Sequence, residues 1–396
     1  MSNEVVIAGA ARTAIGRLSG TLSQFPATGL GAALMRGMCE RLQLAPEAID
    51  DVILGQALTA GAGQNPARQS AIRAAVPDHV PALTVNQVCG SGMAAVIQAV
   101  RAVALGESAL VIAGGQESMS RAPHVLPHSR VGQRSGDWTL VDSMIHDGLW
   151  DAFNDYHMGI TAENVATKFR VSREEQDRFA AGSQQRAEEA GKHGRFESEI
   201  VPLSVPQKSG DAIAFARDEY PRPGVTPERL AELAPAFKPD GTVTAGNAAG
   251  LNDGAAMTVV TTRDKAESLG LLPLVRVAAH ATVGVKPSLM GIGPVAASAR
   301  CLAHADWSVR DLDLVELNEA FAAQAVAVNR QMGWDETGVN VNGGAIALGH
   351  PIGASGARIL VSLIHEMHRR EAERGLATLC VGGGQGLALA VERISA

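Results

Sequence analysis

Two cysteines stand in glycine-rich strings whose residue types could carry nucleophilic or acid–base chemistry. Cys89 lies in VNQVCGSGMAAVIQAV, where a strand-like run passes through Cys-Gly-Ser-Gly into a predicted helix. Backbone N–H groups and the helix dipole at such an N-terminus stabilise a thiolate, and the glycines let a substrate approach the backbone. The pattern predicts a nucleophile, with a small buried core cysteine as the alternative. Cys380 ends a predicted strand in LATLCVGGGQG, where backbone amides can face a ligand, although taken alone it is typical of a core cysteine.

A histidine in a third glycine-rich string could serve one of these cysteines. His350 lies in NGGAIALGHPIGASGARIL, directly before Pro351, which predicts a tight, rigid loop ahead of a helix. A histidine close to a cysteine can act as its general base, so the pair is more informative than either residue alone. Taken alone, a loop histidine bonded to backbone groups is an equal alternative.

Other motifs of recognised chemistry are missing or incomplete. The chain has no GxSxG elbow and no P-loop GxxxxGK[ST]. GIGPVA at 291–296 fits the loose dinucleotide pattern, but it follows KPSLM rather than a predicted strand. HEMH at 365–368 places two histidines at helical spacing without a third ligand, so we expect a solvated helix face and no metal site.

The composition is that of a soluble globular protein with two or three domains. The 396 residues exceed one ordinary core, and hydrophobic and charged residues make up 46% and 19%. The formal net charge of −7 implies no general affinity for nucleic acid or anionic membrane. An anionic substrate would therefore need local positive groups.

We expect a cytoplasmic protein. The first residues carry an early acid and enter a predicted strand at 5–7, unlike a signal peptide, and the apolar stretch 93–105 is broken by Gln98 and Arg101. The cysteines lie far apart without a CxxC pair, which fits a reducing compartment rather than a zinc site or a disulfide scaffold. They are Cys39, Cys89, Cys301 and Cys380.

The sequence partly repeats itself, with three short matches in the same order. These matches are 49–58 with 312–321, 89–94 with 353–358, and 110–116 with 379–385. Three matches in order at nearly one offset indicate a duplication. The alignment places Asn318 opposite Gly55 and Cys380 opposite Val111. Polar or reactive substitutions in one copy of a duplicated core suggest function.

Each half is predicted to be a layered α/β unit with a mixed sheet. Short apolar runs predict buried strands, and longer alanine-rich stretches predict helices. The predicted strands are 5–10, 52–54, 109–113, 314–317 and 377–381, and the predicted helices are 92–105 and 355–370.

The segment 119–249 differs from both halves, since it is more charged and holds ten of the fourteen aromatic residues. It is predicted to be an insertion with its own small core, placed to cover a site. The alternative is a third domain without a catalytic part. Within it, 172–190 is a predicted helix with Ser172 as N-cap and Glu175 completing a capping box.

The chain resembles the thiolases over essentially its full length, and most closely the biosynthetic acetoacetyl-CoA thiolases. The strings that carry the resemblance are RTAIGRLSG, GQNPARQSAIRA, NQVCGSGMAA, AGGQESMSRAPHVLP, YHMGITAENVA, GNAAGLNDGAA, ELNEAFAAQ, GGAIALGHPIGASGAR and LCVGGGQGLA. The resemblance implies an α/β thiolase fold: a duplicated αβαβα core with mixed sheets, an inserted CoA-binding loop domain, and a homotetramer. The expected parts are residues 1–118 with 250–270 for the N-terminal half, 119–249 for the loop domain, and 271–396 for the C-terminal half.

The resemblance also implies roles for five residues in catalysis. Cys89 matches the acyl-carrying nucleophile, Cys380 the second acid/base cysteine, and His350 the catalytic histidine. Asn318 matches the asparagine of NEAF, which holds a water in one oxyanion hole. Gly382 matches the glycine whose N–H forms the other oxyanion hole with that of Cys89.

Substrate-binding positions follow in the same way. Arg222 matches a residue beside the CoA adenine. Where the family commonly has Asn-Ala-Ser-Gly, this chain has Ala248 and Ala249 in the middle, so a serine that contacts the CoA pantetheine is missing. A lost neutral hydrogen bond is typically worth about 0.5–1.5 kcal/mol. The remaining matches to the substrate pocket are Leu149, His157, Met158, Met290, Ala320 and Phe321.

The activity implied by the resemblance is that of an acetyl-CoA C-acetyltransferase. This acyltransferase condenses two acetyl-CoA into acetoacetyl-CoA and CoA reversibly, by a ping-pong reaction through acetyl-Cys89. No metal or cofactor is expected, since CoA is substrate and product, and neither nucleic acid nor membrane is an expected partner.

Three alternatives remain open. A degradative 3-ketoacyl-CoA thiolase would accept longer chains, although YHMG and Met290 favour a short pocket by resemblance. A ketoacyl-synthase-like enzyme using an acyl carrier protein would lack the second cysteine, Cys380. A non-catalytic acyl-CoA binding protein would be expected to lose Cys89, His350 or Cys380.

Overall fold

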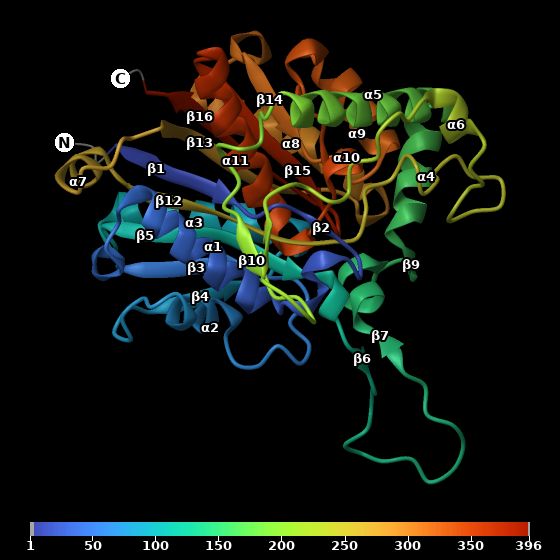
Figure 1. Ribbon diagram of the computed structural model, residues 1–396. Helices are drawn as coiled ribbons and strands as arrows, with labels where there is room; N and C mark the ends of the chain where they lie inside the picture. The colour runs from blue at the N-terminus through green and yellow to red at the C-terminus, as the bar shows by residue number, and fades with distance from the viewer. Residues whose placement is uncertain (1–3, 395–396) are drawn as a thin grey trace.

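A ten-stranded mixed sheet joins the two halves of the chain in the computed structural model, which describes residues 4–394 (Figure 1). The strand order is β14-β15-β16-β13-β1-β12-β5-β3-β4, and β2 (Gly16–Arg17) pairs with β12. The first half supplies β1 (Val5–Arg12), β3 (Asp51–Gly55), β4 (Ala82–Val85), β5 (Leu110–Ser118) and β12 (Asn252–Thr262). The second half supplies β13 (Val275–Gly284), β14 (Leu314–Leu317), β15 (Arg374–Val381) and β16 (Gln385–Arg393).

Helices cover the sheet in layers. The first half supplies α1 (Ala27–Leu42), α2 (Pro66–Arg73), α3 (Ser91–Leu105) and α7 (Arg263–Ser268). The second half supplies α8 (Gly293–Ala305), α9 (Ala322–Met332), α10 (Ala345–Leu348) and α11 (Ile352–Arg370). One buried cluster packs α1 and α2 on the first half, another packs α8 and α9 on the second, and a third joins α3 and α11 between strands of both halves. The predicted duplicated αβαβα core is confirmed.

The sheets of the two halves are continuous, because β1 pairs with β13 through Val6 with Arg276 and Ile7 with Val275. From that junction the first half continues outward through β12, β5 and β3, and the second through β16, β15 and β14. The central helices α3 and α11 contact each other through equivalent glycines. A Cβ on Gly92 of α3 would press on Ala357 of α11, and a Cβ on Gly356 of α11 would press on Met93 of α3.

One of the three sequence matches is wrong in register. Asp51 pairs with Val111 in the first half, whereas its counterpart Leu314 pairs with Gly375 in the second. Val111 therefore corresponds to Gly375, and Cys380 corresponds to Gln116, five positions from the predicted partner. The error came from matching the glycine runs. Side chains alternate between the two faces of a strand, so an alignment that is wrong by five positions assigns Cys380 to the wrong face of the sheet.

Helix α3 is the central helix that leads away from Cys89. With the turn before it, it forms the segment Val88–Leu105, which is the one stretch within residues 4–394 long and apolar enough to cross a membrane. Gln98 and Arg101 do not lower its hydropathy below that of a candidate span, contrary to the sequence-based expectation. Two thirds of this segment is buried in the protein, where α3 packs between the two halves.

The insertion contains short elements around two longer helices, α4 (Met158–Phe169) and α5 (Arg173–Lys192), which lie along one side of the molecule (Figure 1). The predicted capping box of α5 is confirmed, since Ser172 and Glu175 exchange both hydrogen bonds. The short elements are β6 (His124–Val125), β7 (Val141–Asp142), η5 (Met144–Leu149), β8 (Trp150–Asp151), β9 (Tyr156–His157), β10 (Leu203–Val205), β11 (Ile213–Phe215) and α6 (Pro227–Ala231). The β6–β7 hairpin projects from the body (Figure 1).

The prediction that the insertion has its own small core is wrong for the described residues. Ala180 and Ala181 of α5 pack against Ala322 and Ile346 of the second half. Farther along, Phe196 and neighbouring apolar residues join the cluster under α1. The insertion therefore folds onto both halves, which places it where it can wall a cavity between them.

A buried arginine of the first half anchors the insertion. The guanidinium of Arg12 lies 2.6 Å from Glu199 and binds Asp218 through two hydrogen bonds of 2.7 and 2.9 Å. The side chain of Arg12 is fully buried. Removing one partner of such a buried ion pair typically costs about 3–5 kcal/mol.

Candidate active site

One cavity of about 490 Å³ lies where both halves meet the insertion. It collects all but one of the residues that the sequence singled out, although these come from distant parts of the chain. The predicted residues that line it are Cys89, Leu149, His157, Met158, Arg222, Ala248, Ala249, Met290, Ala320, Phe321, His350, Cys380 and Gly382. Asn318 is the exception, because it is fully buried behind the wall.

Cys89 lies in a three-residue turn, Val88–Gly90, directly before α3. Val88 has φ +46°, a left-handed conformation that costs a branched residue about 1–3 kcal/mol. Side-chain oxygens accept hydrogen bonds from the surrounding backbone: Asn86 from the N–H of Val88, and Ser91 from that of Gln87. The strained turn is therefore fixed on both sides, and it holds the thiol at the cavity wall.

Backbone N–H groups favour the thiolate of Cys89, as the sequence suggested, but burial outweighs them. Burial raises the pKa of the Cys89 thiol to about 11, although the N–H groups of Gly382 and Cys89 itself favour the thiolate. Cys89 therefore needs a base to become a nucleophile. The same two N–H groups converge on its sulfur, where an oxyanion hole needs its donors.

His350 brings an unprotonated ring nitrogen to the same cavity. Burial, helped by the charge of Arg358, lowers the pKa of His350 to about 3, so the ring is neutral. Its Nδ1 lies 2.5 Å from the hydroxyl of Ser355, which also lies 2.9 Å from the carbonyl of Pro351. With the Ser355 proton on the Pro351 carbonyl, Nδ1 carries the ring proton, and Nε2, which has no partner among the described residues, keeps a free lone pair.

The loop that carries His350 is held by the first half of the chain. The N–H of His350 donates to Oδ1 of Asn252, 3.0 Å away, and the amide of Asn252 donates to the carbonyl of Gly16. Gly349 has φ +103°, and a Cβ there would strike Asn252 at 2.4 Å. Only glycine fits this turn, which explains the tight loop predicted before the helix.

Cys380 stands near the end of β15, beside a glycine turn. Burial, with a contribution from nearby Cys89, raises the pKa of Cys380 above its usual range. Gly384 has φ +84° and no room for a Cβ against Val285, so this turn also requires glycine. The turn brings the N–H of Gly382 to the Cys89 sulfur.

Asn318 follows β14 and lies behind the cavity wall. Its backbone N–H donates to the carbonyl of Thr378. Neither its amide nitrogen nor its amide oxygen has a protein partner within residues 4–394. Because a buried amide without partners is costly, this side chain is available to hold a water or a substrate atom.

An aromatic wall faces the cysteines across the cavity. The ring of His157 stacks on Phe237 with centroids 4.7 Å apart, and Phe237 meets Phe321 edge-on at 6.2 Å. Nδ1 of His157 accepts the N–H of Gly159, which leaves its Nε2–H free to donate. Phe237 was missed in the sequence, although the concentration of aromatic residues in the insertion was a signal for it.

Two cations line the same cavity in this acidic protein. Arg222 lies 5.5 Å from the ring centroid of Tyr220, and Arg17 comes from the first half. They supply the local positive groups that an anionic substrate needs. Arg17 and Tyr220 were not selected from the sequence; Arg17 lies in RTAIGRLSG, one of the strings that carry the resemblance.

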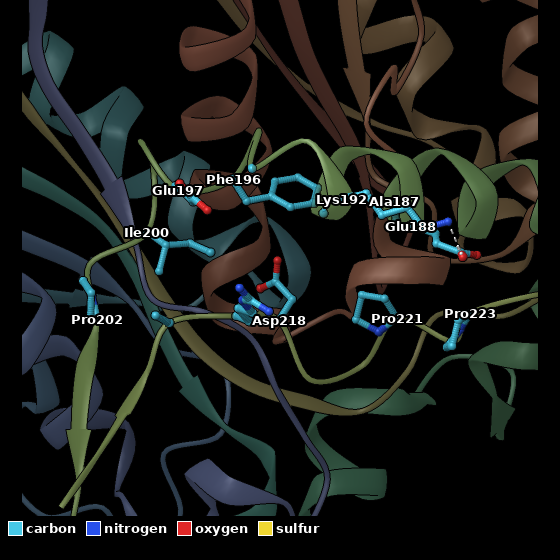
Figure 2. A pocket seen from close by; sticks show the side chains of 14 residues that line it. Ala187, Glu188, Lys192, Phe196, Glu197, Ile200, Pro202, Asp218, Pro221 and Pro223 are labelled. Carbon is cyan, nitrogen blue, oxygen red and sulfur yellow. Dashed lines mark ion pairs between the residues drawn. The ribbon is translucent and has the colours of Figure 1, made fainter.

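A larger cavity of about 590 Å³ contains none of the predicted site residues. Figure 2 shows its side chains, among them Phe196, Ile200 and the ion pair of Glu188 with Lys192 at the end of α5. Pro221 and Pro223 line it, whereas Arg222 between them lines the smaller cavity. Size alone therefore does not find the site, which is defined by its reactive side chains.

Comparisons with known proteins agree with this geometry. Residues 5–264 match the family description "Thiolase, N-terminal domain", and residues 271–393 match "Thiolase, C-terminal domain". The chain is 60% identical to the acetyl-CoA acetyltransferase of Allochromatium vinosum, over 100% of both proteins, and 59% identical to that of Cupriavidus necator, over 98% of this chain and 99% of the other.

Solved structures agree as well. The crystal structure of the Bacillus anthracis acetyl-CoA acetyltransferase is similar with a TM-score of 0.97 and 43% identity, covering 99% of each chain. Human mitochondrial 3-ketoacyl-CoA thiolase in complex with CoA has a TM-score of 0.94 and 40% identity, covering 99% of this chain and 98% of the other.

A duplicated α/β core whose halves bring two cysteines and a neutral histidine to one cavity fits an acyltransferase. The chain belongs to the thiolase family.

Proposed function

We propose that this protein is an acetyl-CoA C-acetyltransferase that reversibly condenses two acetyl-CoA molecules into acetoacetyl-CoA and CoA. The observation that carries the proposal is the convergence of Cys89, Cys380 and the free Nε2 of His350 on one cavity. Relatives 54% to 60% identical to this chain are named acetyl-CoA acetyltransferases, which supports the choice of substrate.

The first half-reaction transfers an acetyl group to Cys89. Its sulfur attacks the thioester carbonyl of acetyl-CoA while Nε2 of His350 takes the thiol proton. The oxyanion accepts hydrogen bonds from the N–H groups of Cys89 and Gly382, and one such donor typically contributes about 2.7–4 kcal/mol. The carbon–sulfur bond to CoA breaks, and the CoA sulfur leaves with the proton of Cys380.

The second half-reaction forms the new carbon–carbon bond. The Cys380 thiolate takes back a proton from the methyl carbon of a second acetyl-CoA. Protonated His350 and a water held by Asn318 stabilise the enolate oxygen. The enolate carbon attacks acetyl-Cys89, acetoacetyl-CoA forms, and the Cys89 sulfur recovers its proton from His350. The cycle needs no metal or redox cofactor, because the side chains supply the nucleophile and both bases.

A degradative 3-ketoacyl-CoA thiolase is the second candidate, favoured by the similarity to the human mitochondrial enzyme. The two candidates share their reactive residues and differ in the acyl chain they accept. Met158, Met290 and Phe321 line the cavity and are expected to limit chain length.

The deciding experiment is CoA-dependent thiolysis of acetoacetyl-CoA, run beside a long-chain 3-ketoacyl-CoA. We expect a strong preference for the short substrate in kcat/KM. Equal or better turnover of the long substrate would move the protein to the degradative class. Folded protein without thiolysis of either substrate would instead support the non-catalytic binding protein.

Replacing Ser355 by alanine is expected to lower kcat about 10²-fold with little change in KM. Without this acceptor the His350 ring loses the hydrogen bond that fixes its tautomer, and misplaced groups typically cost that much. Steady-state thiolysis measures the split between kcat and KM. Ser362→Ala, two turns further along α11, is the control, and wild-type kcat in Ser355→Ala would contradict the proposed tautomer.

Replacing Ala249 by serine is expected to strengthen CoA binding. The variant restores the hydroxyl that the resemblance places against the pantetheine, and a neutral hydrogen bond is worth about 0.5–1.5 kcal/mol. We therefore expect KM for CoA to fall about two- to tenfold at unchanged kcat. Ala214→Ser on the exposed strand β11 is the control. An unchanged KM would show that the missing serine does not matter.

A homotetramer in the cytoplasm is part of the proposal. Resemblance to the family supports the tetramer, and the cysteine spacing supports a reducing compartment. Light scattering on the eluting protein would measure the assembly, and a monomer would contradict it.

A further inference from the structure

A buried glutamate next to the site has no part in the mechanism above. Glu117 lies near the end of β5, and its side chain is fully enclosed. Its carboxylate accepts three backbone hydrogen bonds: Oε2 from Ala57 and Gly353, at 3.0 and 2.9 Å, and Oε1 from Leu58, at 3.3 Å. A buried carboxylate is costly unless it is paired or hydrogen-bonded, so this arrangement calls for an explanation.

The three N–H donors belong to different halves of the chain. Ala57 and Leu58 follow β3 in the first half, whereas Gly353 lies in the first turn of α11 in the second half. Gly353 is three residues after His350 and two before Ser355. Glu117 therefore ties the loop of His350 to the part of the molecule that carries Cys89.

Gly353 has no room for a side chain. A Cβ on Gly353 would lie 2.7 Å from Oε2 of Glu117 and 2.9 Å from both the nitrogen of Ala57 and the carbonyl of Gln116. Gly353 is the residue whose missing side chain lets the carboxylate reach the helix N-terminus.

Glu117 and Asn252 hold the His350 loop from two sides. Asn252 accepts the N–H of His350 itself, and Glu117 accepts that of Gly353. Both come from strands of the first half. The position of the base relative to Cys89 is therefore set by hydrogen bonds between the halves.

The charge of Glu117 also acts on the nucleophile, Cys89. Its charge contributes to the raised pKa of the Cys89 thiol. Burial raises the pKa of Glu117 itself to about 7, against the three N–H donors that favour its charged form. The charge of Glu117 opposes a thiolate at Cys89, so its contribution to the site must come from the backbone groups that it binds.

We infer that Glu117 is a positioning residue: its carboxylate clamps Gly353 to Ala57 and Leu58 and so holds Nε2 of His350 where it can take the proton of Cys89. The inference rests on the proposed function for the role of His350.

Three variants test the clamp. Glu117→Ala removes all acceptors, whereas Glu117→Gln keeps one carbonyl oxygen that can accept from Ala57 and Gly353. Asp313→Asn is the matched control, since Asp313 also accepts two backbone N–H groups, from Glu373 and Arg374, but at the opposite end of β14 from the site. Thermal unfolding of each variant shows which proteins are folded.

The kinetic readout is the split between kcat and KM in acetoacetyl-CoA thiolysis. We expect Glu117→Ala to lower kcat about 10²-fold, as for other displaced catalytic groups, with KM for CoA within about threefold. Glu117→Gln should recover at least tenfold of this loss, and Asp313→Asn should match the wild type. Wild-type kcat in folded Glu117→Ala would overturn the inference. Glu117→Gln as slow as Glu117→Ala would also overturn it, since an acceptor for Ala57 and Gly353 would then not be enough to hold the base.

A second readout needs no acyl-CoA. The rate of Cys89 alkylation by iodoacetamide at pH 7, followed by intact mass, reports how well a base assists the thiol. We expect Glu117→Ala to react at least about tenfold more slowly than the wild type. Equal rates would overturn the inference. If the wild type alkylated rapidly but failed to cleave acetoacetyl-CoA, the proposed function would be wrong while the clamp would still be tested.

Discussion

Replacing Cys89 by serine is expected to abolish the acetyl-enzyme and to lower thiolysis at least about 10⁴-fold, as for other lost nucleophiles. Serine keeps the size of the side chain, but its hydroxyl is a far weaker acid than a thiol, and neutral His350 is a weak base. Intact mass after incubation with acetyl-CoA measures the acetyl group directly. The wild type should gain one acetyl group, and the variant none.

Cys301→Ser is the matched control. Cys301 is a buried cysteine of α8 in the cluster that packs α8 on the second half, and it does not line the cavity. It should acetylate as the wild type does. A labile acetyl group retained on Cys89→Ser would show that another residue is the nucleophile.

Replacing Cys380 by serine is expected to separate the two half-reactions. Cys89 should still become acetylated, although more slowly, because its sulfur, His350 and the N–H of Gly382 remain and only the proton donor to the leaving CoA sulfur is lost. Condensation and thiolysis should fall at least about 10³-fold, since general acid–base catalysis typically contributes up to about 10⁴-fold and serine is a poor proton carrier here. Intact mass measures the first step, and acetoacetyl-CoA formation measures the second.

The same control, Cys301→Ser, should perform both steps. If both half-reactions survive unchanged in Cys380→Ser, its role as second base is wrong. Complete loss of acetylation as well would show that Cys380 does more in the first step than protonate the leaving CoA, which would contradict the expected separation of the two half-reactions.

Local sequence patterns predicted much of this fold because the signals were local. The apolar runs at 52–54 and 314–317 became β3 and β14, and the capping box at Ser172 began α5 as expected. The register of Cys380 was wrong, because a run of glycines can be aligned in several ways and only the ladder of hydrogen bonds distinguishes them. Local pattern also could not show that the insertion would share its apolar residues with both halves.

The residues of the site were likewise predicted only where their signal was local. Cys89, His350 and Cys380 were found because reactive side chains among glycines are unusual. The partners that tune them were not selected: Ser355 lies in the helix after His350, and Glu117 and Asn252 lie far away in the chain. Their roles depend on burial and contact, as does the high pKa of Cys89, where burial outweighs the N–H donors that the sequence suggested.

The duplication gives the fold two equivalent places for a nucleophile, and only one is used. The match of 89–94 with 353–358 makes Gly353 the counterpart of Cys89, and the ladders make Gln116 the counterpart of Cys380. At Gly353 the carboxylate of Glu117 leaves no room for a side chain, and Gln116 is buried and bonded to Ser70 and Gln56. The position that corresponds to Cys89 in the second half thus supports the active site instead of forming a second one. A nucleophile at Gly353 would displace the Glu117 carboxylate that holds the His350 loop.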